Sequence, residues 1–324
     1  MNGTSRERHT RTGIAIRDPL PWNDFLEAAR TAEQTGYEAV FLPEIAGRDA
    51  FAALAGLAAA TTTLRLGTGV VPIVARSVST TAMAAATVHE LSGGRMILGL
   101  GTGPSGPGAL DRLRDGVSRI KAALAGETIQ EPTGGRFRLS LHPGAEPPPV
   151  WIAALGPRAM GLAGEVADGV LLNWCPPERV SFARDRVREG AEAAGRDPSR
   201  VTVAVYVRAC VGQEPEHALP ALQAAAGQYA SFPAYRRQFE QVGLGEEAEA
   251  AARAFRARNP GAVPEALVRR VCVVGEASEA ASRLHAYQDA GADLPVVYPV
   301  AVLDPLSSIL GTLFALAPHP AVEA

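Results

Sequence analysis

One stretch, residues 61–103, constrains the fold of this chain more than any other. It contains two short apolar runs, residues 64–71 and 95–101, which are bounded by Gly or Pro and are too short for buried helices. Such runs are typical of strands that are buried on both faces of a sheet. The Ala-rich segment between them, residues 77–91, is long enough to form a helix that crosses back over the sheet. The stretch therefore predicts a parallel strand–helix–strand unit.

The same alternation of strand and helix runs through the rest of the chain. Six further segments have strand character: residues 13–17, 39–42, 150–154, 169–172, 201–207 and 294–298. Eight strands separated mostly by helices, with no sustained break in composition, predict the α/β class and a single (β/α)8 TIM barrel. An open doubly wound sheet is the alternative. It is disfavoured because no GxGxxG motif with a following acidic residue comes after the first strand.

Two segments interrupt this alternation. Residues 128–141 predict a hairpin insertion after the fourth helix, with its turn at Gly134 and Gly135. Residues 214–258 are rich in Ala, Gln, Glu and aromatic side chains, and they predict extra helices after the seventh strand. The expected organisation is one barrel domain over 13–318 with a helical insertion at 230–260 that could act as a lid, a flexible N-terminal tail at 1–12 and a C-terminal tail at 319–324.

Composition argues against several classes of function. The net charge of the 324-residue chain is −3 and its arginines are scattered, which argues against a nucleic-acid partner. No apolar segment approaches the length of a membrane span, and the N-terminus lacks the apolar core of a signal peptide. The three cysteines form no CxxC motif. The sequence also lacks an HExxH motif and histidines paired at ligand spacing, so it predicts no metal site. We therefore expect a cytoplasmic protein with neither a membrane nor a nucleic-acid partner.

Glycines cluster where the third and fourth predicted strands end. Gly67 and Gly69 belong to the third strand, and Gly99, Gly101 and Gly103 to the fourth or just past it. Glycine at such places marks a bulge, an unusual backbone angle or the close approach of a ligand. Tight packing of strand against helix explains any single one equally well. Two matching clusters at the end where parallel α/β folds bind ligands favour the floor of a site.

The loop after the fifth predicted strand is a candidate phosphate site. In AALGPRAM (residues 153–160), Gly156 and Pro157 turn the chain and Arg158 lies in the first turn of the next helix. Free backbone amides and the positive end of a helix dipole bind anions. A plain loop with Pro at the first helical position explains the same pattern, so both interpretations stay open.

Three motifs together resemble the bacterial luciferase-like family of flavin and deazaflavin oxidoreductases. They are RLGTGVVP (65–72), LSGGR (91–95) and MILGLGTG (96–103), and matches of this kind extend from about residue 13 to 299. The resemblance implies a third-strand bulge with a non-prolyl cis peptide behind the cofactor ring, here at Gly69–Val70. It also assigns the Gly156 loop to the cofactor phosphate. The implied cofactor-binding residues are Gly67, Gly69, Val70, Gly101, Thr102, Leu155, Gly156, Pro157 and Arg158.

Polar residues follow several other predicted strands, and three of them are our catalytic candidates: Glu44, Asn173 and Arg208. Arg17 and Asp18 lie at the same rim. In the family, an acidic residue at the position of Glu44 approaches the ring and is commonly followed by His, but here Ile45 follows. The sugar-phosphate dehydrogenase branch also has a Glu where this chain has Pro104. Both departures argue against that branch and leave the proton donor unidentified.

The resemblance implies a coenzyme F420-dependent oxidoreductase that transfers a hydride between the deazaflavin and a small organic substrate. The GTGV and LSGGR motifs, the Gly-Pro-Arg loop and the missing His after Glu44 favour this branch. An FMN-dependent luciferase-like monooxygenase is the first alternative. A family member that binds a cofactor without turnover is the second. A homodimer is expected from the resemblance alone.

Overall fold

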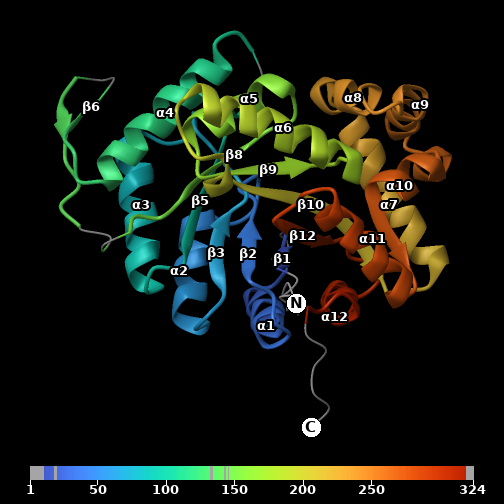
Figure 1. Ribbon diagram of the computed structural model, residues 1–324. Helices are drawn as coiled ribbons and strands as arrows, with labels where there is room; N and C mark the ends of the chain where they lie inside the picture. Colours follow the sequence, from blue (N-terminus) through green and yellow to red (C-terminus); the bar gives the residue numbers. More distant parts are fainter. Residues whose placement is uncertain are drawn as a thin grey trace, which may run out of the picture.

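Eight parallel strands close into a barrel in the part of the chain that the structure describes, with helices packed around it (Figure 1). The computed structural model describes residues 11–17, 20–104, 106–131, 134–141, 144 and 146–318. Asp18, most of the expected N-terminal tail and all of the expected C-terminal tail lie outside the described residues. The barrel closes because the first strand pairs with the last, which confirms the predicted TIM barrel. Its strands are β1 (Gly13–Ala15), β2 (Ala39–Leu42), β3 (Arg65–Thr68), β5 (Met96–Gly101), β8 (Val150–Ala153), β9 (Gly169–Asn173), β10 (Thr202–Val211) and β12 (Leu294–Pro299).

The helices follow the predicted alternation. Short 3-10 turns, η1 (Pro198–Arg200) and η2 (Pro260–Ala262), precede β10 and α10. The α-helices are α1 (Trp22–Gln34), α2 (Ala50–Ala60), α3 (Val78–Leu91), α4 (Ala109–Leu124), α5 (Pro157–Val166), α6 (Pro177–Ala193), α7 (Pro215–Ala230), α8 (Pro233–Glu240), α9 (Gly245–Arg256), α10 (Glu265–Val271), α11 (Ala277–Asp289) and α12 (Pro305–Ala315).

Large rings fill the interior of the barrel. Phe41 packs against Trp151 and Tyr206, with ring centroids 5.6 and 6.2 Å apart, and Tyr206 packs against Tyr298 at 5.4 Å. Opposite these rings the strands carry glycine. A Cβ on Gly67 would lie 2.4 Å from the ring of Phe41, so the neighbouring strands can accept the ring only where the side chain is absent.

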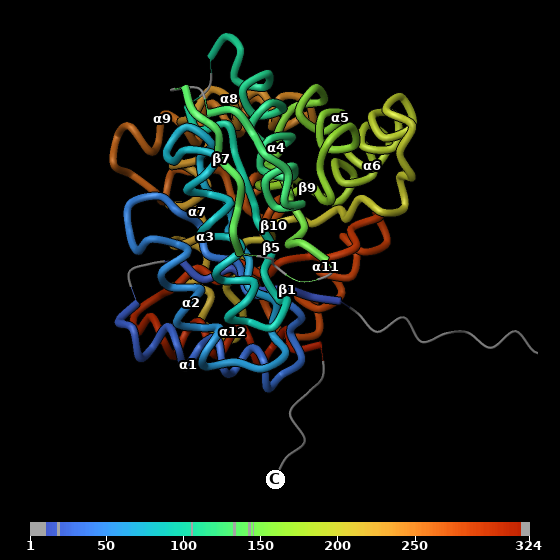
Figure 2. Tube along the Cα trace, turned by 90° about the vertical axis from the view of Figure 1, so that its left-hand side faces the viewer, coloured from blue at the N-terminus to red at the C-terminus, as the bar shows by residue number. Residues whose placement is uncertain are grey.

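The predicted hairpin is confirmed. Strands β6 (Ile129–Gln130) and β7 (Arg136–Phe137) pair antiparallel, and both Gly134 and Gly135 have positive φ, which favours glycine. The hairpin lies beside α3 and α4, at the far left of Figure 1. Figure 2 views the molecule from this side, with β7 in front of the barrel.

The extra helices after the seventh barrel strand lie on the opposite side of the molecule from the hairpin (Figure 1). They share a second core of their own with β10 and α10, built around Leu222, Phe239 and Leu267. A short strand that the sequence analysis misses, β11 (Cys272–Gly275), pairs with β10 outside the barrel. It starts directly where α10 ends, so no turn residue marks the boundary in the sequence.

Helices α5 and α6 pack closely because α5 carries a glycine where the backbone of α6 approaches it. A Cβ on Gly164 of α5 would lie 2.0 Å from the carbonyl oxygen of Val187 on α6 and 2.7 Å from the amide of Ala191. A Cβ on Gly161, one turn earlier on the same helix, would meet nothing closer than 3.9 Å. The two glycines therefore differ in what packing requires of them.

We expect Gly164→Ala to lower the free energy of unfolding by about 1–3 kcal/mol, because the methyl group forces the two helices apart. Gly161→Ala is the matched control and should raise it by about 0.5–1 kcal/mol, because alanine loses less backbone entropy in a helix. Urea unfolding followed by circular dichroism measures both. Equal effects of the two substitutions would contradict the close contact at Gly164.

Candidate functional site

The predicted site residues lie around one end of the barrel. Glu44 follows β2, Gly69 and Val70 follow β3, Thr102 follows β5, and the loop 155–158 follows β8. Asn173 ends β9, and Arg208 lies near the end of β10. Because the barrel strands are parallel, their carboxyl ends surround a common mouth. The strands β3, β5 and β8 form one half of this mouth, and β10, β12 and β1 form the opposite half.

The peptide bond between Gly69 and Val70 is cis, as the resemblance predicted. It divides the third barrel strand, so that β3 and β4 (Val71–Pro72) pair separately with β5. The carbonyl oxygen of Gly69 accepts a hydrogen bond of 3.0 Å from the hydroxyl of Tyr206, across the barrel. Next to it, the hydroxyl of Thr68 donates to the carbonyl oxygen of Gly99 and accepts from its amide, both at 2.8 Å. The backbone at this bulge is thus held from two sides.

Internal packing accounts for the glycines of β3 and β5. A Cβ on Gly69 would lie 1.8 Å from the Tyr206 hydroxyl, and one on Gly101 would lie 2.8 Å from Cγ2 of Val70. Together with Gly67, whose space the Phe41 ring fills, these positions need glycine whether or not a ligand binds. Packing was the alternative that the sequence left open. Contact of Gly67, Gly69, Val70, Gly101 and Thr102 with a cofactor stays a prediction.

The loop after β8 has the geometry of an anion site. Gly156 caps α5 in an extended conformation, and Pro157 is the first residue of the helix. Among the described residues, none accepts a hydrogen bond from the backbone amides of Leu155, Gly156 or Arg158. A Cβ on Gly156 would meet no atom within 4 Å, and the side chain of Arg158 is exposed. These amides therefore have no partner among the described residues, and a positive charge lies beside them.

Arg179 of α6 supports this loop through a hydrogen bond, and the sequence analysis did not identify this residue. Its guanidinium is only 5% exposed, and its Nη2 donates to the carbonyl oxygen of Leu155 at 3.1 Å and to Oε1 of Gln241 at 2.7 Å. Burial lowers the pKa of Arg179. Because arginines recur through α6, the sequence holds no signal that separates this buried one from the less buried arginines of the same helix.

Arg208 lies in a cage of aromatic rings on the opposite half of the mouth. Its Cζ is 4.0 Å from the ring centroid of Tyr298, 4.7 Å from that of Trp174 and 5.2 Å from that of Tyr229. Its guanidinium donates to Oδ1 of Asn173 and, at 3.4 Å, to the hydroxyl of Tyr229. The structure thus brings two of the three catalytic candidates into direct contact.

Helix α8 holds the end of β9 in place. Nδ2 of Asn173 donates to the hydroxyl of Tyr235 at 2.8 Å. The side-chain amide of Gln238 donates to the carbonyl oxygens of Asn173 and Trp174 at 2.9 and 2.7 Å. Trp174 has φ of 52°, a left-handed conformation that is rare for a bulky residue. The inserted helices therefore shape the mouth directly.

Glu44, the third catalytic candidate, has structural partners. Its Oε2 accepts from the amide of Ala50, at the start of α2, at 2.9 Å, and from Nη2 of Arg76 at 3.1 Å. Arg76 also pairs with Asp49, which caps the same helix through the amide of Ala52. The structure thus places Glu44 in an ion-pair network apart from Asn173 and Arg208, and its catalytic role stays a prediction.

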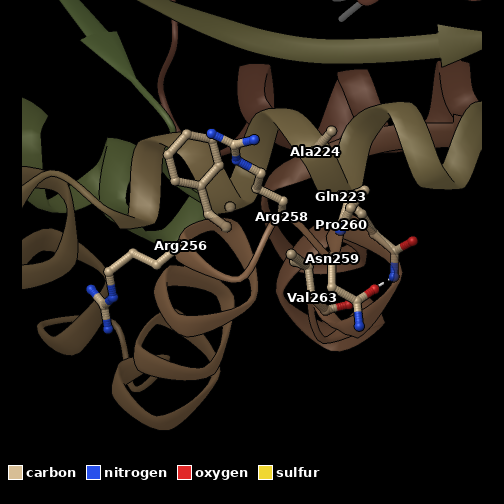
Figure 3. Close-up of a pocket in the computed structure, with 9 residues that line it drawn as sticks. Gln223, Ala224, Arg256, Arg258, Asn259, Pro260 and Val263 are labelled. Atoms are coloured by element: carbon tan, nitrogen blue, oxygen red, sulfur yellow. Dashed lines mark hydrogen bonds between the residues drawn. The ribbon is translucent and has the colours of Figure 1, made fainter.

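Two cavities lie on either side of α7. One, of about 350 Å³, opens at the mouth and includes Arg17, Trp174, Arg208, Tyr229 and Tyr298 in its lining. The other, of about 550 Å³, lies between α7, α9 and η2. Figure 3 shows it, with Gln223 hydrogen-bonded to the carbonyl oxygen of Val263 at 2.7 Å and Arg256 directed away from the other labelled side chains. None of the predicted site residues lines the second cavity.

Other chemistries find little support. Within the described residues, no group of three or more His, Cys, Asp or Glu side chains is arranged to hold a metal ion. Cys175, Cys210 and Cys272 are free and buried, and burial raises their thiol pKa values to about 12, 11 and 12. Thiols with such high pKa values are poor nucleophiles.

None of the described helices combines the length and the apolar character that crossing a membrane requires.

The chain resembles several proteins of known description. It is 32% identical over 207 residues to a 5,10-methylenetetrahydromethanopterin reductase of Methanolobus tindarius, covering 60% of this chain and 64% of that protein. It is 30% identical over 206 residues to a Mycobacterium tuberculosis protein described as a coenzyme F420-dependent oxidoreductase, covering 56% of this chain and 59% of that protein. Both matches thus span less than two thirds of the relatives' own length.

A solved structure has the same fold. It is the coenzyme F420-dependent tetrahydromethanopterin reductase of Methanopyrus kandleri, with a TM-score of 0.81 at 21% identity, covering 94% of this chain and 97% of that one. The model of the family described as luciferase-like monooxygenase matches residues 4–294, which is most of the chain. This protein therefore belongs to the luciferase-like monooxygenase family.

Proposed function

We propose that this protein is a coenzyme F420-dependent oxidoreductase that transfers a hydride between the deazaflavin and a small organic substrate. One observation carries the proposal: the loop after β8 presents free amides of Leu155, Gly156 and Arg158 at the mouth of a luciferase-like barrel. The name of the Methanolobus tindarius relative, a reductase, supports reduction chemistry. The name of the Mycobacterium tuberculosis relative supports the choice of F420 over FMN.

The residues present fit a phosphate-bearing cofactor. Three unpaired amides at the start of a ten-residue helix, with the exposed Arg158 beside them, form a site for a phosphate. Arg179 donates to the carbonyl oxygen of Leu155, a contact that would help to fix the conformation of this loop. The space at Gly156 leaves room for the anion, because no other described residue places an atom within 4 Å of a Cβ built there.

F420, when bound, accepts or supplies the hydride. We assign the Gly69–Val70 bulge together with Gly101 and Thr102 to one border of the ring site, and the loop 155–158 to its phosphate. The opposite half of the mouth, where Arg208 lies in contact with Asn173 of β9, is left for the substrate. Tyr206 donates a hydrogen bond to the carbonyl oxygen of Gly69 and so supports the bulge from within the barrel. The partners of Glu44 suit a role in ordering the loop after β2.

We further infer a cytoplasmic homodimer with a single barrel domain, in which α8 and α9 could act as a lid. Three buried free cysteines support a reducing compartment.

The proposed dimer has a candidate contact surface on α3. Met83 and Leu91, 46% and 56% exposed on this helix, lie eight positions apart and hence on one helix face. An apolar helix face of this kind is suited to a subunit contact. Light scattering of the purified protein should give twice the mass of one chain, and the mass of a single chain would contradict the dimer.

The choice of cofactor can be tested by titration. We expect purified protein to bind F420 with a Kd at least about tenfold lower than that for FMN, measured by the fluorescence of each cofactor. The absorbance of bound F420 should then change on addition of at least one member of a panel of enones, imines, alcohols and aldehydes. Tighter binding of FMN, or FMN retained through purification, would favour the monooxygenase alternative. Binding of F420 without any redox change would favour the family member without turnover.

The phosphate loop can be tested at Gly156. We expect Gly156→Asp to stabilise the protein slightly, by roughly 0.3 kcal/mol, because Asp is a better helix cap than Gly. It should nevertheless raise the Kd for F420 about tenfold, because its carboxylate occupies the amides and repels a phosphate. These opposite effects separate loss of binding from loss of folding.

Gly156→Asn is the matched control, because it offers the same cap without the negative charge. Its Kd for F420 should rise by about threefold at most. If Gly156→Asp binds F420 as tightly as the wild type, the phosphate does not lie at this loop. Thermal unfolding and fluorescence titration measure the two effects on the same samples.

A further inference from the structure

We propose that the cavity between β1, β10, β12 and α7 binds a substrate that carries a carboxylate on a compact, apolar body, with Arg208 as the residue that pairs with the carboxylate. The inference rests on the proposed function, because it names the substrate class for the same barrel mouth. It depends on the charge, the shape and the position of this cavity.

The cavity has a positive charge that the described residues do not balance. Its lining includes Arg17 and Arg208 but no Asp or Glu among the described residues. Arg208 is only 3% exposed, and its partners there are neutral: Asn173, Tyr229 and the aromatic rings. A buried charge is costly unless it is paired, and aromatic faces compensate for only part of that cost. An anionic ligand would supply the missing counter-charge.

The guanidinium also has donors left for a ligand. Arginine carries five N–H donors, and the described partners of Arg208 are one amide oxygen and one hydroxyl. A carboxylate matches the planar fork of a guanidinium with two parallel hydrogen bonds. The aromatic cage holds the fork in one orientation, so little side-chain freedom would be lost on binding. Arg17, exposed at the rim, adds a second charge that attracts anions.

The remaining lining describes the rest of the substrate. Apart from Gln228, it consists of apolar or aromatic residues, among them Ile16, Leu20, Val300 and Ile309. The volume of about 350 Å³ lies near the lower end of the usual range for ligand pockets. The occupant is therefore a small molecule whose body is apolar and whose single anionic end points toward Arg208.

The position of the cavity suits a substrate that meets a cofactor. Tyr206 connects the two halves of the mouth: its hydroxyl is 3.0 Å from the carbonyl oxygen of Gly69, and its ring centroid is 5.8 Å from Cζ of Arg208. One tyrosine side chain thus separates the guanidinium from the bulge assigned to the ring. A carboxylate on Arg208 would hold the body of the substrate beside that bulge.

Pairs of probes that differ only in charge test the proposal on the full-length protein. Benzoate and hexanoate are titrated against benzamide and hexanamide by calorimetry, without cofactor. We expect each acid to bind at least about tenfold more tightly than its amide, and Arg208→Gln to weaken acid binding by about tenfold to a hundredfold. Amide binding should stay unchanged. Arg208→Lys keeps the charge without the fork and should bind the acids with intermediate affinity.

Two further variants complete the test. Arg17→Gln, at the exposed rim, should weaken acid binding by about threefold and keeps the test valid if Arg208→Gln fails to fold. Arg200→Gln is the matched control. Arg200 is exposed in η1, just before the start of β10 and far along that strand from Arg208, so the substitution should leave acid binding unchanged. If neither acid binds more tightly than its amide, or if folded Arg208→Gln binds the acids like the wild type, the proposal is wrong.

A separate F420 titration distinguishes this inference from the proposed function. Acid binding that depends on Arg208 in a protein that does not bind F420 would support the carboxylate site and overturn the cofactor assignment. F420 binding without acid selectivity would support the cofactor assignment and overturn the carboxylate site.

Discussion

The mouth of this barrel depends on how its interior is filled. Phe41 and Tyr206 project into the barrel, and β3 can lie against them only because Gly67 and Gly69 have no side chains. Cores are packed as densely as crystals, so a ring of this size determines what the facing strand can carry. The same contact fixes the bulge, because the Tyr206 hydroxyl holds the carbonyl oxygen of Gly69. The packing inside the barrel therefore also determines the backbone geometry at its mouth.

The inserted helices connect the two halves of the mouth. Helix α8 holds β9 through Tyr235 and Gln238. The residue that follows this helix, Gln241, is linked to the loop 155–158 through Arg179. A movement of α8 would therefore disturb both the arginine cage and the amides after β8. If this segment acts as a lid, its opening would break the contacts of Tyr235, Gln238 and Gln241.

The distribution of charge at the mouth follows from these contacts. Among the described rim residues, Glu44 is paired with Arg76, whereas Arg158 and Arg208 have no acidic partner. A mouth in which acids are neutralised and arginines are not attracts anions. The two arginines lie on opposite halves of the mouth, so the proposed phosphate and the proposed carboxylate would not compete for one position.

The sequence by itself determined the elements that depend on short-range patterns. The alternation of strands and helices, the hairpin at Gly134–Gly135 and the loop at Gly156 all follow from residues within a few positions of one another. The family resemblance added the cis peptide at Gly69–Val70. These features could be predicted because turn chemistry and hydrophobic period act locally.

Only the tertiary structure decided which partner each of these residues meets. Tyr206 and Gly69 are 137 positions apart, and Arg208 is 35 positions from Asn173. The burial of Arg179, the pairing of Glu44 and the extra strand β11 likewise depend on contacts between distant segments. A side chain's environment is set by what the closed barrel brings next to it, and no local pattern encodes that. The aromatic cage of Arg208 exists only because β9, β10, β12 and α7 meet at one mouth.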